Sequence, residues 1–279
     1  MRREALKNSI LDLLHCPICH EKLAFANEGK SCKCEGIKSH CFDFSKSGYL
    51  NLSGPHGGMG DQKDAIRARS LFLNAGYYQP LADYLSQKLD LLGVKYLLDA
   101  GCGEGYYTNR FAAHRDVIGA DLSKDGIDTA AKASKHQQTG AGFIIASLFS
   151  LPIPDKTLDA VINIFAPCAE DEFLRVLKPG GYLILVAAGE KHLMGLKERL
   201  YENTYLNKER ADLPRKMKQV AKDTFAYSIT VESSEQIEAL FSMTPYYWRT
   251  SEEDRQKLRN LESLTTDLDF DIYLFRKDG

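Results

Sequence analysis

The chain has 279 residues, of which 44% are hydrophobic and 27% charged, and its formal net charge at pH 7 is −2. This composition is that of an ordinary globular protein with room for one large domain and one small one, and the near-zero net charge excludes a uniformly basic surface for nucleic acid. The charge is nevertheless uneven, because residues 1–70 contain eleven Lys and Arg against eight Asp and Glu, and residues 207–222 contain six against two. Such patches could meet phosphates, although charge runs are more often solvated faces.

The N-terminal residues MRREALKNSI do not lead into an apolar core followed by a small-residue cleavage site, so they do not indicate a signal peptide. The longest apolar stretches, near residues 97–100 and 183–188, are shorter than the roughly 20 residues of a membrane span. We therefore expect a cytoplasmic protein without a membrane partner. In a reducing compartment, closely spaced cysteines usually indicate metal binding or catalysis.

Five of the seven cysteines lie between residues 14 and 44. A C-x2-C pair, a later cysteine and then a histidine supply three thiolates and one imidazole, which matches a closed tetrahedral zinc site. The predicted ligands are Cys16, Cys19, Cys34 and His40. Cys32 stays open as an alternative to Cys34, and Cys41 as a weaker alternative to His40. A set of buried apolar cysteines would not account for this spacing.

A glycine-rich segment, SGPHGGMG at residues 53–60, separates the cysteine-rich part from the rest of the chain. The next chemical motif is YLLDAGCGEGYYT at residues 96–108, which predicts a strand, a glycine turn and a helix. Glycines at Gly101, Gly103 and Gly105 would let a cofactor approach the backbone, and Asp99 precedes them. A second predicted strand, DVIGAD, ends in Asp121, whose carboxylate is placed to hold ribose hydroxyls.

The spacing G-x-G-x-G differs from the G-x-G-x-x-G of a typical dinucleotide fold. Two later segments, LPIPDKTLDAVINI and RVLKPGGYLILV, each predict a turn followed by an apolar strand. Together, residues 95–190 resemble the class I S-adenosylmethionine-dependent methyltransferases. The resemblance implies an α/β, Rossmann-like domain with a seven-stranded sheet. An NAD-binding domain and a degenerate, non-catalytic fold remain alternatives.

Phrases along nearly the whole chain resemble a narrower group, the RlmA-type 23S ribosomal RNA (guanine-N1)-methyltransferases. They are HCFD (residues 40–43), SKSGYLNL (45–52), ARSLFLNAGYYQPL (68–81), GCGEGYYT (101–108), IFAPC (164–168), HLMGLK (192–197), MTPYYWR (243–249) and DFDIYLFR (269–276). Family members methylate a guanine in a hairpin loop of 23S rRNA, and some related members confer macrolide resistance. The implied cofactors are S-adenosyl-L-methionine and structural Zn²⁺, and the implied partner is the 23S rRNA hairpin, with a homodimer as an open alternative to a monomer.

The resemblance also assigns residues. The family's zinc ligands fall on the four predicted above, although the gap between the third cysteine and the histidine is longer here by two residues. The family's cofactor contacts fall on Tyr78, Gly103, Glu104 and His192, in addition to the positions Asp99, Gly101, Gly105 and Asp121 given by the glycine motif. The implied division is a zinc-binding RNA-recognition module at 1–53, a linker with helices at 54–94, and a methyltransferase domain at 95–279 with a helical insertion at about 195–222.

Other functions remain alternatives at this point. Cys168 follows the fourth predicted strand of the domain, where cytosine-C5 methyltransferases place a nucleophilic thiolate. A non-catalytic, zinc-dependent RNA-binding or assembly factor is a second alternative. Tyr246, Tyr247 and Trp248 are candidates for a wall against the target base, or for core packing. No side chain identifies itself as the base that accepts the guanine N1 proton, and the sequence does not indicate which guanine is methylated.

Overall fold

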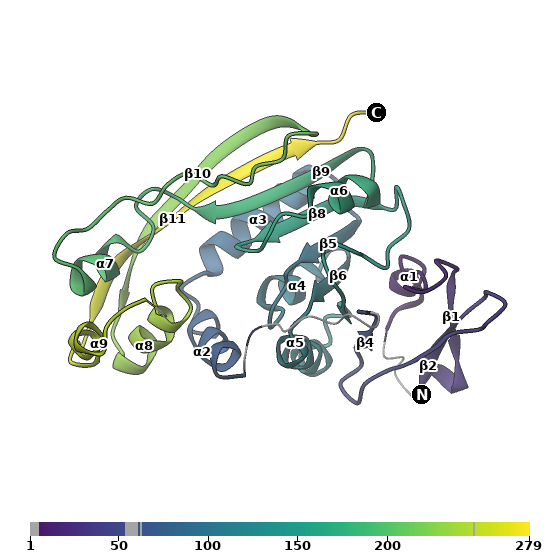
Figure 1. The fold of residues 1–279 in the computed structure, drawn as a ribbon, viewed down its shortest axis with the longest axis horizontal. Coiled ribbons are helices and arrows are strands. Elements are labelled where there is room, and N and C mark those ends of the chain that lie inside the picture. Colours follow the sequence, from purple (N-terminus) through teal and green to yellow (C-terminus); the bar gives the residue numbers. More distant parts are fainter. Residues whose placement is uncertain (1–5, 54–60, 62, 248) are drawn as a thin grey trace.

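The computed structural model describes residues 6–53, 61, 63–247 and 249–279. At its centre lies an eight-stranded mixed sheet with the order β10-β11-β9-β8-β5-β6-β7-β4 (Figure 1). The strands are β4 (Leu50–Asn51), β5 (Tyr96–Ala100), β6 (Asp116–Asp121), β7 (Gly142–Ile145), β8 (Leu158–Ile164), β9 (Leu177–Ala188), β10 (Lys218–Val231) and β11 (Leu264–Arg276). The six strands from β4 to β9 pair in parallel, and β11 and β10 add an antiparallel edge.

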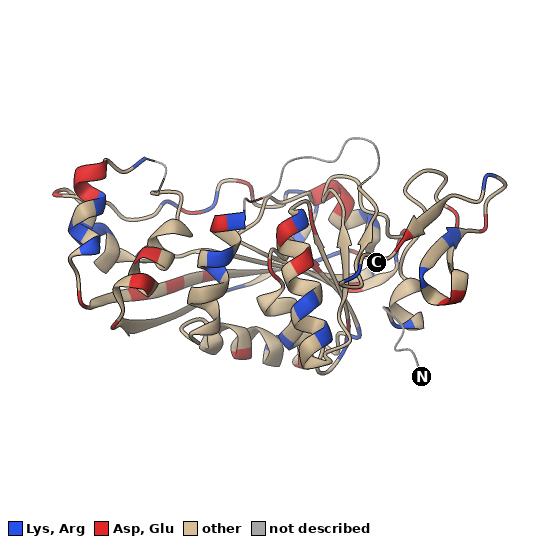
Figure 2. Cartoon of the chain, turned by 90° about the horizontal axis from the view of Figure 1, so that it is seen from below, with Lys and Arg blue, Asp and Glu red and all other residues tan. Residues whose placement is uncertain are grey.

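Helices and smaller elements cover both faces of this sheet. The helices are α1 (Asn8–Leu11), α2 (Lys63–Asn74), α3 (Gln79–Leu91), α4 (Tyr106–Phe111), α5 (Lys124–Gln137), α6 (Glu170–Val176), α7 (Met194–Leu200), α8 (Ser234–Ser242) and α9 (Glu252–Arg259). None of the described helices is long and apolar enough to cross a membrane. In the view of Figure 2, Lys and Arg alternate with Asp and Glu along the helices and do not form one basic face.

Two apolar cores result from the sheet being buried on both sides. Leu97 contributes to a core shared with most of the helices, including Phe111 of α4 and Ile127 of α5. The neighbouring Leu98 faces the opposite core, which contains Phe173 of α6. Successive strand residues point to opposite faces, so a parallel strand covered on both sides must be apolar throughout. The runs YLLDA and LDAVINI obey this rule.

The cysteine-rich segment forms a small three-stranded antiparallel sheet of β1 (Leu23–Ala26), β2 (Ser31–Cys34) and β3 (Cys41–Asp43), with a 3-10 turn η1 (Asn27–Gly29) between the first two strands. Its core is continuous with the second core of the large sheet, because Leu14, Leu23 and Cys32 belong to the same apolar cluster as Leu98. The short strand β4 then pairs in parallel with β7. The cysteine-rich module is therefore packed on the large sheet, and β4 extends the seven strands implied by the resemblance to eight.

The C-terminal part of the sheet differs from one prediction. The segments 224–231 and 269–276 belong to β10 and β11, which pair antiparallel. The expected helical insertion at about 195–222 differs, because only Met194–Leu200 is helical before β10 begins. The connection between them is held by side chains: Lys197 donates to the Tyr205 carbonyl at 3.1 Å and to the Asn207 side-chain oxygen at 2.6 Å. These contacts replace the backbone bonds that a helix would supply.

Candidate active site and metal centre

The glycine turn between β5 and α4 is closely packed on two sides. A Cβ atom on Gly101 would lie 2.4 Å from the Ala166 Cβ, and one on Gly105 would lie 2.6 Å from the Ala130 Cβ. Both glycines also have positive φ, at 82° and 74°. A side chain at either position would be excluded by sterics and strained by the backbone. The packing therefore explains two of the three glycines of the G-x-G-x-G motif, Gly101 and Gly105, and it places the turn after β8 against the glycine turn.

Asp99 lies beneath this turn at the end of β5. Its side chain is buried and accepts a hydrogen bond from the Thr108 hydroxyl at 2.5 Å. Burial raises the pKa of Asp99 to about 7, against the lowering effect of the Thr108 bond. Asp99 therefore ties β5 to α4, and its predicted role toward the cofactor stays a prediction.

Asp121 lies beside the turn at the end of β6, the neighbouring strand. One carboxylate oxygen accepts from the Gly103 amide at 3.0 Å, and the other accepts from the Ser123 amide at 2.7 Å. Each oxygen retains capacity for a further hydrogen bond, since a carboxylate oxygen has two lone pairs. The side chain is thus held at the carboxyl edge of the parallel strands, where ligands bind in open α/β folds.

Glu104 is the second carboxylate at the turn, and only 7% of the residue is exposed. Burial raises its pKa to about 7, and the neighbouring Arg69 guanidinium opposes that rise. Arg69 of α2 donates to Glu104 at 3.4 Å and to Asp61 at 2.6 Å. Arg69 is not among the predicted site residues, although it lies in the ARSLFL segment that resembles the family. The only sequence signal was a basic residue in that segment, and nothing in the sequence indicated that Glu104 would be its partner.

Tyr78 and His192 are brought together although they are 114 residues apart. The Asp269 amide donates to His192 Nδ1 at 3.2 Å, and burial lowers the pKa of His192 to about 4. The imidazole is therefore neutral, with its proton on Nε2, which donates toward the Tyr78 hydroxyl at 3.5 Å. Tyr78 in turn packs edge-on against Phe270, with ring centroids 5.4 Å apart. The structure thus places this predicted pair in one buried cluster.

The turn after β8 carries Cys168. Burial raises the pKa of its thiol to about 11, and the nearby Arg210 opposes that rise. Asn163 donates to the Ala100 carbonyl at 3.0 Å, and Arg210 reaches the Asn163 side-chain oxygen at 3.4 Å. A thiol with a raised pKa is a poor nucleophile at neutral pH, which argues against the cytosine-type role of Cys168.

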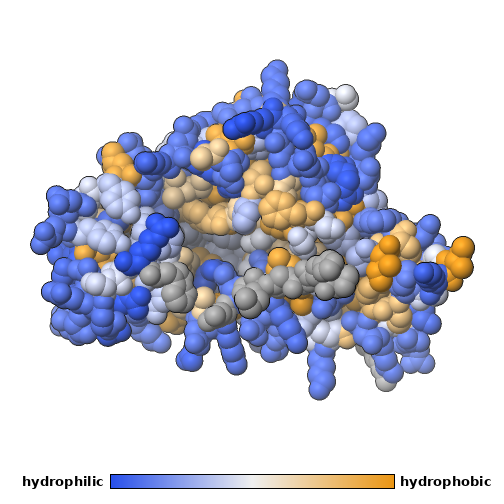
Figure 3. All heavy atoms as spheres, viewed as in Figure 1, coloured by the Kyte–Doolittle hydropathy of each residue, from blue (hydrophilic) through white to orange (hydrophobic). Residues whose placement is uncertain are grey.

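The predicted aromatic wall at 246–248 is only partly described. Tyr246 donates to the Asn207 side-chain oxygen at 3.1 Å and packs edge-on against Tyr201, and Tyr247 packs edge-on against Phe241. Trp248 lies outside the described residues. These contacts favour the packing interpretation for the two tyrosines. On the face shown in Figure 3, apolar residues instead border a hollow near the middle of the molecule.

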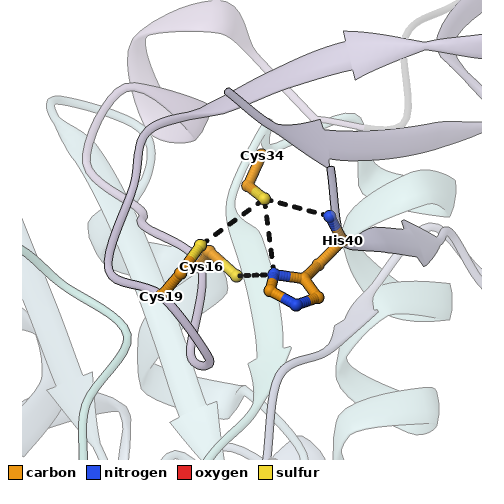
Figure 4. A group of neighbouring side chains, drawn as sticks. All are labelled: Cys16, Cys19, Cys34 and His40. Atoms are coloured by element: carbon orange, nitrogen blue, oxygen red, sulfur yellow. Dashed lines mark hydrogen bonds between the residues drawn. The ribbon is translucent and has the colours of Figure 1, made fainter. Parts of the chain in front are cut away.

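The four predicted zinc ligands meet at one point (Figure 4). Their ligand atoms all lie within 4.8 Å of one another, and the separations include 3.5 Å from Cys16 Sγ to His40 Nδ1, 3.6 Å from Cys19 Sγ to Cys34 Sγ and 3.5 Å from Cys34 Sγ to His40 Nδ1. A tetrahedron with Zn–S bonds of about 2.3 Å has edges of roughly 3.7 Å, so the set fits Zn²⁺. The His40 amide also donates to Cys34 Sγ at 3.0 Å, which favours a thiolate there.

The two alternative cysteines lie outside this cluster. Cys32 is fully buried in the shared core, and burial raises the pKa of its thiol to about 12. Cys41 is exposed on β3. Among the described residues, the ligand set is therefore the one with Cys34 and His40, despite the longer gap between them.

Residues 14–53 match a zinc-ribbon family described as "RlmA, N-terminal", and residues 98–185 match a family described as "Methyltransferase domain". A protein of Micromonospora griseorubida, provisionally named a 23S rRNA (guanine-N(1)-)-methyltransferase, is 34% identical over 68% of this chain and 70% of its own length. The chain belongs to the RlmA-type 23S rRNA (guanine-N1)-methyltransferase family.

Other relatives agree with this membership. YxjB of Bacillus subtilis (strain 168), also provisionally named a 23S rRNA (guanine-N(1)-)-methyltransferase, is 29% identical over 95% of this chain and 97% of its own length. The 23S rRNA (guanine(748)-N(1))-methyltransferase of Streptomyces fradiae is 29% identical over 70% of each chain. A solved Galdieria sulphuraria structure, provisionally named a sarcosine dimethylglycine methyltransferase, shares the fold at 14% identity (TM-score 0.50, 77% of this chain and 98% of that chain). The protein is thus an S-adenosylmethionine-dependent methyltransferase with a structural zinc site.

The raised pKa of Asp99 predicts a pH-dependent stability. The unfolded carboxyl is already ionised at pH 6, whereas the native carboxyl releases its proton near pH 7. Stability therefore falls as pH rises, by about 1.4 kcal/mol between pH 6 and pH 8 for this group. Asp99→Asn should abolish the Asp99 contribution to this decrease in the free energy of unfolding and leave the contribution of Glu104, whose pKa is also raised. Urea unfolding without cofactor at the two pH values measures it, and a variant with the full pH dependence of the parent would contradict the assignment.

The zinc ligand set predicts opposite effects for two neighbouring cysteines. Cys34→Ser should lower bound zinc well below one ion per chain, because it removes a thiolate from the tetrahedron. Cys32→Ser, two residues away on the same strand, should retain one ion per chain. Elemental analysis of both purified variants measures this, and zinc retained by the first but lost by the second would make Cys32 the ligand.

Proposed function

We propose that the protein transfers a methyl group from S-adenosylmethionine to N1 of a guanine in a hairpin loop of 23S rRNA. The observation that carries this proposal is similarity along nearly the whole chain, zinc ribbon included, to relatives named for that reaction. A methyltransferase domain alone would be compatible with many acceptors, because fold does not determine substrate. The zinc ribbon narrows the choice to the ribosomal RNA group.

The residues around the glycine turn are proposed to hold the cofactor. Asp121, fixed by two backbone amides, is placed to accept hydrogen bonds from ribose hydroxyls. Gly101, Gly103 and Gly105 carry no side chain, which would permit close approach of the cofactor to the backbone of the turn, and Glu104 lies at the same turn. Tyr78 and His192 are proposed to border the same site from the β9 side. When bound, S-adenosylmethionine supplies an already activated methyl group.

The chemistry then depends mainly on placement. When it takes up the methyl group, guanine N1 would lose its proton to water or to a carboxylate or backbone carbonyl placed beside it, and no protein nucleophile is needed. The raised pKa of the Cys168 thiol is consistent with such direct transfer. The cytosine-C5 alternative would require a thiolate at this position, and a purely RNA-binding role would leave the intact Asp99, Gly101 and Asp121 arrangement unexplained.

The zinc module is proposed to bind the RNA. Its ribbon extends from the sheet beside α1, and the first 70 residues carry more Lys and Arg than Asp and Glu (Figure 1). Basic side chains bind phosphates without sequence preference and thereby position the hairpin. A ribosomal substrate implies a cytoplasmic location, and a homodimer stays a prediction.

Two variants at the same edge of the sheet test the proposal with opposite expectations. Asp121→Ala should weaken S-adenosylmethionine affinity about tenfold or more, because a charged hydrogen-bond acceptor is lost. Cys168→Ser should retain methylation of unmodified 23S rRNA, with the product identified as N1-methylguanine by mass spectrometry. Calorimetry and a methyl-transfer assay measure these effects. Unchanged affinity would remove the role of Asp121, and complete inactivity of folded Cys168→Ser with a trapped protein–RNA adduct in the parent would favour cytosine.

A further inference from the structure

One aromatic residue at the carboxyl edge of the sheet is both exposed and strained. Phe165 directly follows β8, has φ of +54°, and is 49% exposed. A positive φ is rare for a bulky side chain and costs energy, and such residues are concentrated at functional sites. An exposed phenyl ring at this edge also lies where open α/β folds bind their ligands.

The surroundings impose this conformation through the backbone of the turn. The Phe165 amide donates to the Val186 carbonyl of β9 at 3.1 Å. Arg210 donates to the Ala166 carbonyl at 2.9 Å, and Asn163 donates to the Pro167 carbonyl at 3.2 Å. Three consecutive residues are therefore held by separate partners. The backbone that carries the ring is therefore held before any ligand arrives, which lowers the entropic cost of a stacking contact.

The ring is the open end of an otherwise buried aromatic cluster. Its centroid lies 5.8 Å from the His192 ring and 6.1 Å from the Phe270 ring. Those two residues are 6% and 0% exposed. Phe165 thus rests on a rigid base while about half of its surface remains open to a ligand.

A basic segment reaches the turn that carries this ring. Arg210 donates to the Ala166 carbonyl, is paired with Asp212 at 2.6 Å, and belongs to residues 207–222, which carry six Lys and Arg against two Asp and Glu. A stacking ring next to a basic segment is the combination with which proteins hold an unpaired nucleotide.

We propose that Phe165 stacks on the target guanine after it leaves the hairpin loop, while the segment containing Arg210 contacts the adjoining phosphates. This inference rests on the proposed guanine methylation and adds the residue that holds the base. Stacking fixes the plane of the base but does not distinguish one base from another. Phe165 would therefore position the guanine without selecting it. A contact between Phe165 and the cofactor is the competing role.

Three substitutions at this position separate stacking from a structural role. Phe165→Ala should lower kcat/KM for the rRNA hairpin about tenfold to hundredfold, whereas Phe165→Tyr, which keeps the aromatic face, should retain it within about threefold. Phe165→Gly should be as inactive as the alanine variant but at least as stable as that variant, because glycine tolerates the positive φ. All three should bind S-adenosylmethionine like the parent. Leu91→Ala, an exposed apolar residue at the far end of α3, is the control.

Fluorescence provides a direct measure of the contact. The hairpin carries 2-aminopurine in place of the guanine that the parent methylates, and stacking on an aromatic ring should quench its emission with the parent and Phe165→Tyr but not with Phe165→Ala. Normal kcat/KM for Phe165→Ala would overturn the inference alone, and a tenfold loss of S-adenosylmethionine affinity would assign Phe165 to the cofactor instead. A parent that methylates no guanine would overturn the proposed function and this inference together.

Discussion

The close packing of the glycine turn against its neighbours is the constraint on which the rest of the site depends. Because a Cβ at Gly101 would lie 2.4 Å from the Ala166 Cβ, the turns after β5 and β8 can approach only if that position is glycine. Asp121 and Phe165 lie at the same edge of the sheet because β6 and β8 both run parallel to β5. If the cofactor and the acceptor bind as proposed, the packing of these turns would set their relative placement for in-line transfer.

The zinc module packs on the same sheet. Binding of zinc to its thiolates and imidazole would supply folding free energy that about 40 residues could not obtain from their own core. The module is nevertheless not independent, since Leu14 and Leu23 share a core with Leu98 and β4 pairs with β7. A rigid attachment of this kind would keep the proposed RNA-binding surface of the module at a fixed distance from the carboxyl edge of the sheet.

Local motifs made much of the protein predictable from sequence. The four zinc ligands and the strand, glycine turn and helix depend on short-range spacing, and the structure brings these ligands together. Side-chain contacts between residues far apart in the sequence could not be predicted in this way. The contacts of Arg69 with Glu104 and of Arg210 with the turn after β8 join residues 35 and 44 positions apart, and nothing in either local pattern indicates them. The expected helix after residue 200 failed for the same reason, because side-chain contacts such as those of Asn207 hold an irregular chain. The positive φ of Phe165 likewise arises from its tertiary partners.

The most direct test of the account is to map guanine methylation in the cell. Mass spectrometry would compare 23S rRNA from a strain lacking the gene with rRNA from the same strain carrying the parent protein or Asp121→Ala. The account predicts that one hairpin-loop guanine loses its N1-methyl group on deletion, regains it with the parent, and regains little with the variant. An unchanged guanine methylation pattern, or loss of a methyl group from cytosine C5, would contradict it.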